Sequence, residues 1–198
     1  MNVIIINSQG GNVKSLKNAL DKLGISSVIS CDKTVISNAD FIILPGQGHF
    51  GSIMADLQKK GLVSLLQNAA QTKPFLGICV GMQLLLEASE EAKGTPGLEI
   101  IPGTSKRLPA NVTTPHMGWN TVSFAKDSKF ADLEGDYYFA NSYYCEPTDK
   151  SPVKGWYDYG MQYPAVFEKE NMLAVQFHPE KSGELGLQLL KKSMELHS

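Results

Sequence analysis

The sequence predicts an α/β protein with a central, mostly parallel β-sheet, helices on both of its faces and a second half rich in β-hairpins. Two observations carry this prediction. Short apolar runs alternate with helix-periodic segments over residues 1–90, and strand-like runs separated by Gly, Pro and Asp follow them. Alternating strands and helices favour a parallel sheet, because parallel neighbours need a crossover connection. We expect residues 1–198 to form a single domain, since no linker, repeat or low-complexity tract divides the chain.

The first half is expected to hold four buried strands. These are short apolar runs at residues 3–6, 28–30, 41–44 and 75–78. Apolar residues at helical spacing predict helices over residues 13–23, over 53–69 with a break near Gly61, and over 82–88. Gly24 is expected to end the first of these helices.

The second half is expected to form hairpins and one closing helix. Strand-like runs occupy residues 121–124, 137–144, 165–167 and 173–177, and turn residues join them. Leu185, Leu189, Leu190 and Met194 then recur at helical spacing and predict an amphipathic helix.

Composition and charge exclude several classes of protein. The net charge is −2, and no long run of like charges suggests a nucleic-acid surface. Arg107 is the only arginine among 18 basic residues, which argues against a highly anionic substrate held by this chain alone. No apolar stretch approaches the roughly 18 residues of a membrane span or resembles a signal peptide. Three cysteines without a CxxC pair suit a reducing, cytoplasmic setting and leave room for one working thiol.

Cys79 is the leading candidate for a catalytic residue. It stands between Gly77 and Gly81, where a run expected to be a buried strand meets a helix-like segment. This Gly-x-Cys-x-Gly pattern is the cysteine form of the nucleophile elbow, a tight turn that lifts the nucleophile above the sheet. Free N–H groups at a helix start favour the reactive thiolate, and the N–H of Val80 is placed to face a developing oxyanion. The alternative is an inert core cysteine, the usual role of a lone Cys.

His178 is the expected base for this thiol. It follows the strand-like run 173–177 and precedes a proline, which favours extended backbone. In an extended chain positions 178 and 180 point to the same side, so Glu180 would hold one ring nitrogen while the other faces the thiol. A solvated surface His-Pro-Glu is the alternative. The other histidines, expected in loops or in the tail, are His49, His116 and His197.

A glycine-rich segment at residues 46–51 admits two interpretations. Its sequence, GQGHFG, fits the G-x-G-x-x-G pattern of dinucleotide-binding loops. Such a site also needs an acidic residue near the end of the next strand, and none stands beside Ile78. We therefore interpret the segment as a loop whose N–H groups help to form an oxyanion site opposite Cys79.

Three segments together resemble the triad-type, class I glutamine amidotransferases. They are GICVGMQ at 77–83, LPGQGHFG at 44–51 and VQFHPEKSG at 175–183. Two more, PHMGWN at 115–120 and YYFANSYY at 137–144, look like one branch of that family, the glutaminase subunits of imidazole glycerol phosphate synthase. The resemblance covers essentially the whole chain. It implies a flavodoxin-like class I glutaminase fold and an enzyme of histidine biosynthesis that uses no metal or other cofactor.

The resemblance also implies a mechanism. Cys79 attacks the carboxamide carbon of glutamine, and His178 protonates the departing ammonia. His178 then activates water against the glutamyl thioester, and Glu180 orients and stabilises the imidazolium. The positions that the resemblance assigns to the oxyanion and to glutamine are Gly46, Gln47, Gly48, Val80, Gln83, Ser142 and Tyr143.

A partner subunit is implied as well. In this branch the ammonia passes into a (β/α)₈-barrel cyclase, with which the glutaminase forms a heterodimer. The cyclase makes imidazole glycerol phosphate and the purine intermediate AICAR, so a phosphate-rich substrate would sit on the other subunit. Four residues match family positions near that interface, although ordinary surface or core roles are the alternative: Asn12, Trp119, Tyr138 and Lys181.

Three departures from the family pattern keep other functions open. Asn7-Ser-Gln-Gly stands where Asp-Tyr-Gly is common, Gln47 where Val is usual, and Asn141 where His commonly precedes Ser-Tyr. They are compatible with a paralogue that supplies ammonia to a synthase amidating a sugar for surface polysaccharide, whereas the intact HMGWN segment favours the histidine branch. Two further alternatives are a stand-alone cysteine hydrolase on the same topology and a catalytically silent binding subunit.

Overall fold

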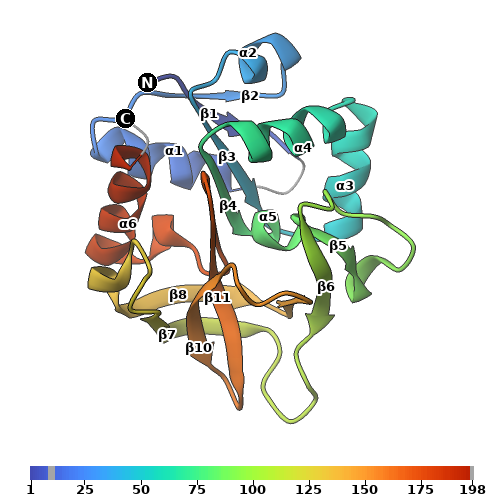
Figure 1. Ribbon diagram of the computed structural model, residues 1–198, viewed down its shortest axis with the longest axis vertical. Coiled ribbons are helices and arrows are strands. Elements are labelled where there is room, and N and C mark those ends of the chain that lie inside the picture. Colours follow the sequence, from blue (N-terminus) through green and yellow to red (C-terminus); the bar gives the residue numbers. More distant parts are fainter. Residues whose placement is uncertain (9–11, 197–198) are drawn as a thin grey trace.

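The computed structural model describes residues 1–8 and 12–196 (Figure 1). Gln9 and Gly10 of the first departing loop, and His197 of the tail, lie outside the described residues. The strands are β1 (Val3–Ile6), β2 (Ser27–Ser30), β3 (Phe41–Gly46), β4 (Phe75–Cys79), β5 (Leu86–Ser89), β6 (Ile101–Arg107), β7 (His116–Phe124), β8 (Gly135–Asn141), β9 (Tyr143–Pro147), β10 (Val153–Asp158), β11 (Gln162–Lys169) and β12 (Met172–Val175). The helices are α1 (Val13–Lys22), α2 (Lys33–Ser37), α3 (Phe50–Lys59), α4 (Val63–Thr72), α5 (Val80–Gln83) and α6 (Gly183–Glu195), with short 3₁₀ turns η1 (Glu90–Ala92), η2 (Ala131–Leu133) and η3 (Pro179–Lys181).

A nine-stranded sheet forms the centre of the molecule, in the order β2-β1-β3-β4-β12-β11-β10-β7-β8. Its first five strands pair in parallel, and the remaining four continue it in antiparallel fashion. Every residue of β1 and β3 is buried, which explains why these strands read as unbroken apolar runs. The mostly parallel core and the hairpin-rich second half predicted from the sequence are both confirmed.

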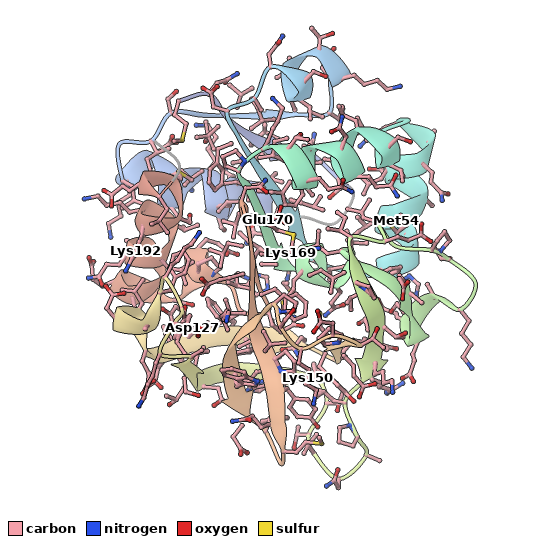
Figure 2. All side chains as sticks on the ribbon, viewed as in Figure 1. Met54, Asp127, Lys150, Lys169, Glu170 and Lys192 are labelled. Carbon is pink, nitrogen blue, oxygen red and sulfur yellow. The ribbon has the colours of Figure 1, made fainter. Side chains whose placement is uncertain are left out.

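Helices cover this sheet on two sides. In Figure 1, α1 and α6 lie on one side of β1, β3 and β4, and α3 and α4 lie on the other. Side chains fill the space between the sheet and the helices (Figure 2), and Met54 of α3 is among those that are fully buried. Gly24 adopts a φ of +73° just after α1, as expected of a residue that ends a helix. No helix among the described residues is long and apolar enough to cross a membrane.

Two element predictions are wrong. The helix expected over 82–88 is only the single turn α5, after which the chain enters β5. Strand β5 pairs in parallel with β6, and the amides of Leu98 and Ile100 donate to the carbonyls of Leu84 and Leu85. These long-range bonds outweigh the local preference of the leucine-rich run for a helix. The strand expected over 137–144 divides at Ser142 into β8 and β9, which belong to different sheets.

Some elements carry too weak a local pattern to be predicted. They are α2, β6 and β10. His116, expected in a loop, begins strand β7 and is buried in a stack with Phe139, Tyr157 and Tyr159. His49 caps α3, where its Nδ1 accepts a hydrogen bond from the amide of Gly51 at 3.1 Å.

Candidate active site

Cys79 occupies a strained turn between β4 and α5. Its φ of 55° and ψ of −111° lie outside the regions that non-glycine residues usually adopt. Packing enforces this turn, because a Cβ on Gly81 would lie 1.9 Å from the carbonyl oxygen of Leu44. A Cβ on Gly77 would lie 3.0 Å from the carbonyl oxygen of Gly81. The strained backbone and close glycines are the geometry of a nucleophile elbow. Since α5 has four residues, the free N–H groups of one turn, rather than a long helix dipole, face this position.

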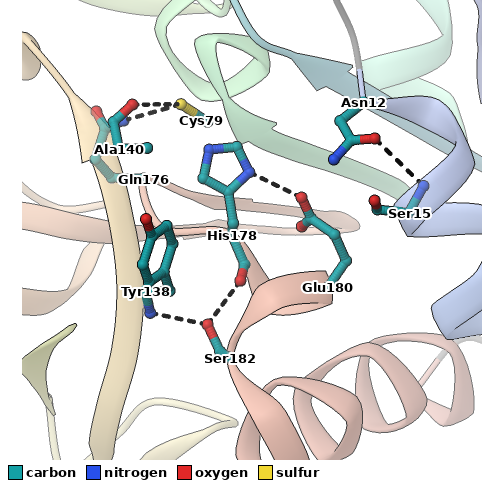
Figure 3. A network of polar contacts seen from close by, with 9 residues as sticks. All are labelled: Asn12, Ser15, Cys79, Tyr138, Ala140, Gln176, His178, Glu180 and Ser182. Atoms are coloured by element: carbon teal, nitrogen blue, oxygen red, sulfur yellow. Dashed lines mark hydrogen bonds and ion pairs between the residues drawn. The ribbon is translucent and has the colours of Figure 1, made fainter. Parts of the chain in front are cut away.

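His178 and Glu180 form a buried pair beside the elbow. The Nδ1 atom of His178 lies 2.9 Å from Oε1 of Glu180, and the two side chains are 3% and 4% exposed. The sequence argument assumed an extended chain here, but the 3₁₀ turn η3 folds Glu180 back to the ring. The Ser182 hydroxyl fixes the turn: it donates to the His178 carbonyl at 2.6 Å and accepts from the Tyr138 amide at 2.9 Å (Figure 3). Sequence reasoning missed Ser182.

The second ring nitrogen of His178 is left for Cys79. Figure 3 shows the imidazole between Cys79 and Glu180, with Nδ1 facing the carboxylate. The Nε2 atom is buried and forms no hydrogen bond with any described residue. Burial opposes protonation of this ring, but the charges of the Cys79 sulfur and the Glu180 carboxylate outweigh it and raise the pKa of His178 to about 10. The ring is therefore ready to act as a proton donor at neutral pH.

A cavity of about 110 Å³ opens next to Cys79. Six of the seven residues predicted for the oxyanion and substrate line it, namely Gln47, Gly48, Val80, Gln83, Ser142 and Tyr143. The seventh, Gly46, instead packs against the elbow, since a Cβ there would lie 2.7 Å from the Gly81 amide nitrogen. The φ of Gly48 is +119°, a value that favours glycine. The elbow, the glycine loop and β9 thus converge on one cavity.

Glu91 is a cavity residue that the sequence did not reveal. Among the residues that line the cavity it is the one acidic side chain. Its Oε2 accepts a hydrogen bond from the Phe50 amide at 2.7 Å, which fixes the carboxylate. No motif marks Glu91, because its place depends on the unpredicted strand β5 that leads into η1.

Three of the four predicted interface residues form one group around the Tyr138 ring, and the fourth, Asn12, lies beside the His178–Glu180 pair. Trp119 is 58% exposed and contacts the Tyr138 ring edge-on, with centroids 6.0 Å apart. Lys181 places its Nζ 6.0 Å from the centre of the same Tyr138 ring. Asn12 lies on the other side, where it lines a space of about 10 Å³ with His178 and Glu180. Its Oδ1 also caps α1 by accepting from the Ser15 amide at 3.4 Å.

The departure at Asn141 is accommodated inside the protein. Asn141 is buried, and its Nδ2 donates to the Tyr143 carbonyl at 3.1 Å and to the Tyr157 hydroxyl at 3.4 Å. Gln47 is exposed and lines both the cavity and the space beside Glu180. The backbone N–H of Asn7 donates a hydrogen bond to the Ser30 carbonyl at 3.0 Å.

Known proteins match this chain over nearly its whole length. Residues 4–195 match the family model "Glutamine amidotransferase class-I". The imidazole glycerol phosphate synthase subunit HisH of Methanothermobacter thermautotrophicus is 43% identical over 197 residues, covering 98% of each chain. The HisH subunit of Thermus thermophilus is 45% identical over 192 residues, covering 96% of this chain and 95% of that one.

Solved structures share the fold. A crystal structure of a glutamine amidotransferase superposes with a TM-score of 0.78 at 18% identity, covering 98% of both chains. The structure of PurLQS from Thermotoga maritima gives a TM-score of 0.74 at 19% identity, covering 100% of this chain and 99% of that chain. The flavodoxin-like fold implied by the resemblance is therefore confirmed. The chain belongs to the class-I glutamine amidotransferases, and within them to the HisH family.

Proposed function

We propose that this protein is a glutaminase subunit that hydrolyses glutamine and delivers the ammonia to a cyclase partner. The observation that carries the proposal is that the strained Cys79 elbow and the Gly48 loop line one cavity, while the His178–Glu180 pair lies buried beside the elbow. The cyclase would use the ammonia to make imidazole glycerol phosphate and AICAR in histidine biosynthesis. The shared HisH name of relatives 43–45% identical supports this pathway.

The first half of the reaction forms a thioester. The Cys79 thiolate attacks the carboxamide carbon of glutamine, and the amides of Val80 and Gly48 donate to the oxyanion. The pKa of His178, raised to about 10, keeps its ring protonated at neutral pH. The ring passes its proton to the departing nitrogen, which leaves as ammonia and leaves His178 neutral. Glu180 holds the ring through Nδ1, so Nε2 is the atom that moves the proton.

The second half restores the enzyme. Neutral His178 removes a proton from water, and the resulting hydroxide attacks the thioester carbon. The C–S bond breaks, glutamate leaves, and Cys79 and His178 return as thiolate and imidazolium. The γ-carboxyl proton of the product passes to solvent, so the sum is glutamine and water to glutamate, ammonia and a proton, and no metal or redox cofactor is needed. In this proposal Glu91 supplies the negative charge that meets the α-ammonium of the bound glutamine.

The partner is expected on the exposed face that carries Trp119 and Tyr138. Met117, two residues before Trp119 on β7, is 65% exposed, so two large apolar side chains stand free on one strand. Lys181 follows Glu180 directly in the chain, so this face adjoins the triad. Exposed aromatic and sulfur-containing side chains are typical anchors of protein interfaces. We propose a cytoplasmic heterodimer in which a single domain spanning residues 1–198 docks through this face.

The test is glutamate release from glutamine by the purified chain, with and without the cyclase subunit of the same genome and its nucleotide ligand. We expect strong stimulation by the partner and loss of activity in Cys79→Ala, while folding and partner binding persist. Cys31→Ala is the matched control, because Cys31 is a half-buried thiol on another part of the chain. Normal glutamate release by Cys79→Ala would contradict the mechanism. Absence of stimulation in a folded chain would instead point to a sugar-amidating synthase as the partner.

A further inference from the structure

Gln176 is a second polar side chain directed at the Cys79 sulfur. It is fully buried, and its Nε2 lies 3.8 Å from Sγ of Cys79 (Figure 3). Gln176 follows β12 directly. The next residue, Phe177, packs its ring into the core, with its centroid 4.1 Å from that of the Tyr137 ring. The chain bends at residues 176–177, and Figure 3 shows the side chains of Gln176 and His178 both next to Cys79. The side chains of Gln176 and His178 thus approach the elbow from the same stretch of chain.

The hydrogen-bond network determines which end of the Gln176 amide faces the sulfur. Gln83 donates its Nε2 to the backbone carbonyl of Tyr143 at 3.0 Å, and a carbonyl can only accept. The same Gln83 nitrogen lies 3.2 Å from Oε1 of Gln176. Oε1 must therefore accept from Gln83, and the amide nitrogen of Gln176 is left to face Cys79. The orientation is fixed by a backbone group rather than by an arbitrary choice between nitrogen and oxygen.

Besides His178, two polar groups contact the sulfur, and these two favour opposite ionisation states. The carbonyl of Ala140 lies 4.0 Å from Sγ and can interact favourably only with the thiol, as an acceptor of its proton. The N–H of Gln176 donates, and hydrogen bonds to a charged acceptor are stronger than those to a neutral one. Among the described residues Cys79 is the one acceptor for this buried nitrogen, so the donor is not shared. Its effect is to favour the thiolate.

We propose that Gln176 is a positioning residue that donates a hydrogen bond to the Cys79 thiolate, and that Gln83 holds this donor in place. The use of the thiolate to attack glutamine rests on the proposed function, whereas the contact with the sulfur does not. Gln83 then has two roles, one as a cavity residue and one behind the nucleophile.

The experiment follows alkylation of Cys79 by iodoacetamide against pH in the full-length chain, read by mass spectrometry. All variants carry Cys31→Ser, because Cys31 is partly exposed, whereas Cys145 is buried and, unlike Cys79, does not line the cavity. We expect Gln176→Met to raise the midpoint of the reaction profile by about one pH unit, the effect of losing one hydrogen bond to a charged group. Gln67→Met is the matched control, since the Gln67 amide instead donates to the Leu98 carbonyl at 3.2 Å.

A second variant separates the sulfur contact from a purely structural role. Gln176→Glu keeps an acceptor for Gln83 but replaces the donor at the sulfur with an oxygen. The new carboxylate also repels the thiolate, so a midpoint raised further than in Gln176→Met is the result that supports the proposal. A wild-type midpoint in Gln176→Glu, with a shift only in Gln176→Met, would show that Gln176 merely supports Gln83 and would overturn it.

Further readouts keep the test decisive if a Gln176 variant fails to fold. Gln83→Met leaves Gln176 in place but removes the bond that orients it, so we expect a smaller rise of the same sign. An unchanged midpoint in Gln83→Met and in every folded Gln176 variant would refute the proposal. The variants could show these shifts while the wild-type chain releases no glutamate from glutamine, even with the partner. That result would contradict the proposed function and leave the contact between Gln176 and the sulfur standing.

Discussion

Removing the Cys79 sulfur should return the titration of His178 to the ordinary range. The pKa of His178 is raised to about 10, although burial of the ring disfavours its charged form. Interactions that favour the imidazolium must therefore outweigh the cost of burial. A unit negative charge about 4 Å away, at an effective dielectric constant of about 20, contributes about 4 kcal/mol, or about three pKa units. In Cys79→Ala the Glu180 carboxylate still favours the imidazolium while burial still opposes it. We therefore expect the pKa of His178 to fall by about three units in this variant.

The measurement is a pH titration of histidine ring signals by NMR in the wild-type chain, Cys79→Ala and Glu180→Gln. The chain has four histidines, so the signal of His178 is assigned by its loss in His178→Asn. His116 serves as the internal control. Burial lowers its pKa, it stacks on Tyr159 with centroids 3.9 Å apart, and its titration should be the same in all three proteins. Glu180→Gln should lower the pKa of His178 by a smaller amount, about one to two units for one hydrogen bond to a charged group.

One result would refute this account of the site. If His178 in Cys79→Ala still titrated near the value of the wild-type chain, the sulfur would not be the group that holds the proton on the ring. The first step proposed above, in which a thiolate attacks beside an imidazolium, would then lose its electrostatic basis. If the pKa of His178 fell strongly in Glu180→Gln and not in Cys79→Ala, the Glu180 carboxylate alone would account for the raised pKa.

Two further predictions concern the elbow and the partner face. Gly81→Ala should lower the free energy of unfolding by about 3 kcal/mol, because the new Cβ meets a rigid backbone oxygen at 1.9 Å. Gly94→Ala is the control, because Gly94 has a φ of +81° and open space around it, and it should lower the free energy of unfolding by only about 1 kcal/mol. Urea titrations measure both free energies, and equal losses in the two variants would contradict the packing argument. Trp119→Ala should weaken partner binding about 30-fold, the effect of losing a contact of about 2 kcal/mol. Val28→Ala, on the distant edge strand β2 and 49% exposed, should leave the partner's dissociation constant unchanged, and equal effects of the two variants in calorimetry would exclude the anchor role.

The parallel half of the fold could be predicted because its signals are local. Strands β1 and β3 are buried along their whole lengths, so their burial appears in the sequence as continuous apolar runs. Helix α1 begins at an Asn cap and ends before Gly24, and both signals lie within the helix's own segment. The break near Gly61 is likewise local, since its φ of +64° separates α3 from α4. Local patterns and the global fold agree in these elements.

The errors fall where a distant strand decides the structure. Residues 86–89 have a leucine-rich, helix-like sequence, yet they pair with β6, whose polar sequence was not recognised as a strand. The chain at Ser142 changes sheets because β8 pairs with β7 while β9 pairs with β6. The sequence pattern of residues 137–144 does not reveal that the strand divides there. Partner choice between strands is a property of the whole fold, so a reading of single segments misses it.

The candidate site divides in the same way. Cys79 and His178 were found because each stands in a short pattern with a chemical reason, the elbow and the His-Pro-Glu turn. Ser182, Glu91 and Gln176 were missed because each acts through a neighbour from another part of the chain. Ser182 bonds β8 to η3, Glu91 caps α3 from η1, and Gln176 reaches the sulfur from the end of β12. These supporting contacts become visible only when the fold brings the segments together.

The chemistry of Gln83 shows what such contacts add. A primary amide has two N–H donors and one acceptor oxygen, and Gln83 uses its donors on the Tyr143 carbonyl and on Gln176. No described residue donates to its oxygen, which is therefore the atom left for a ligand in the cavity. An acceptor there suits the α-ammonium or the carboxamide N–H groups of glutamine and opposes a carboxylate oxygen. In the proposed mechanism, the pairing behind the nucleophile thus leaves Gln83 to meet glutamine as an acceptor, a polarity that the residue name alone leaves open.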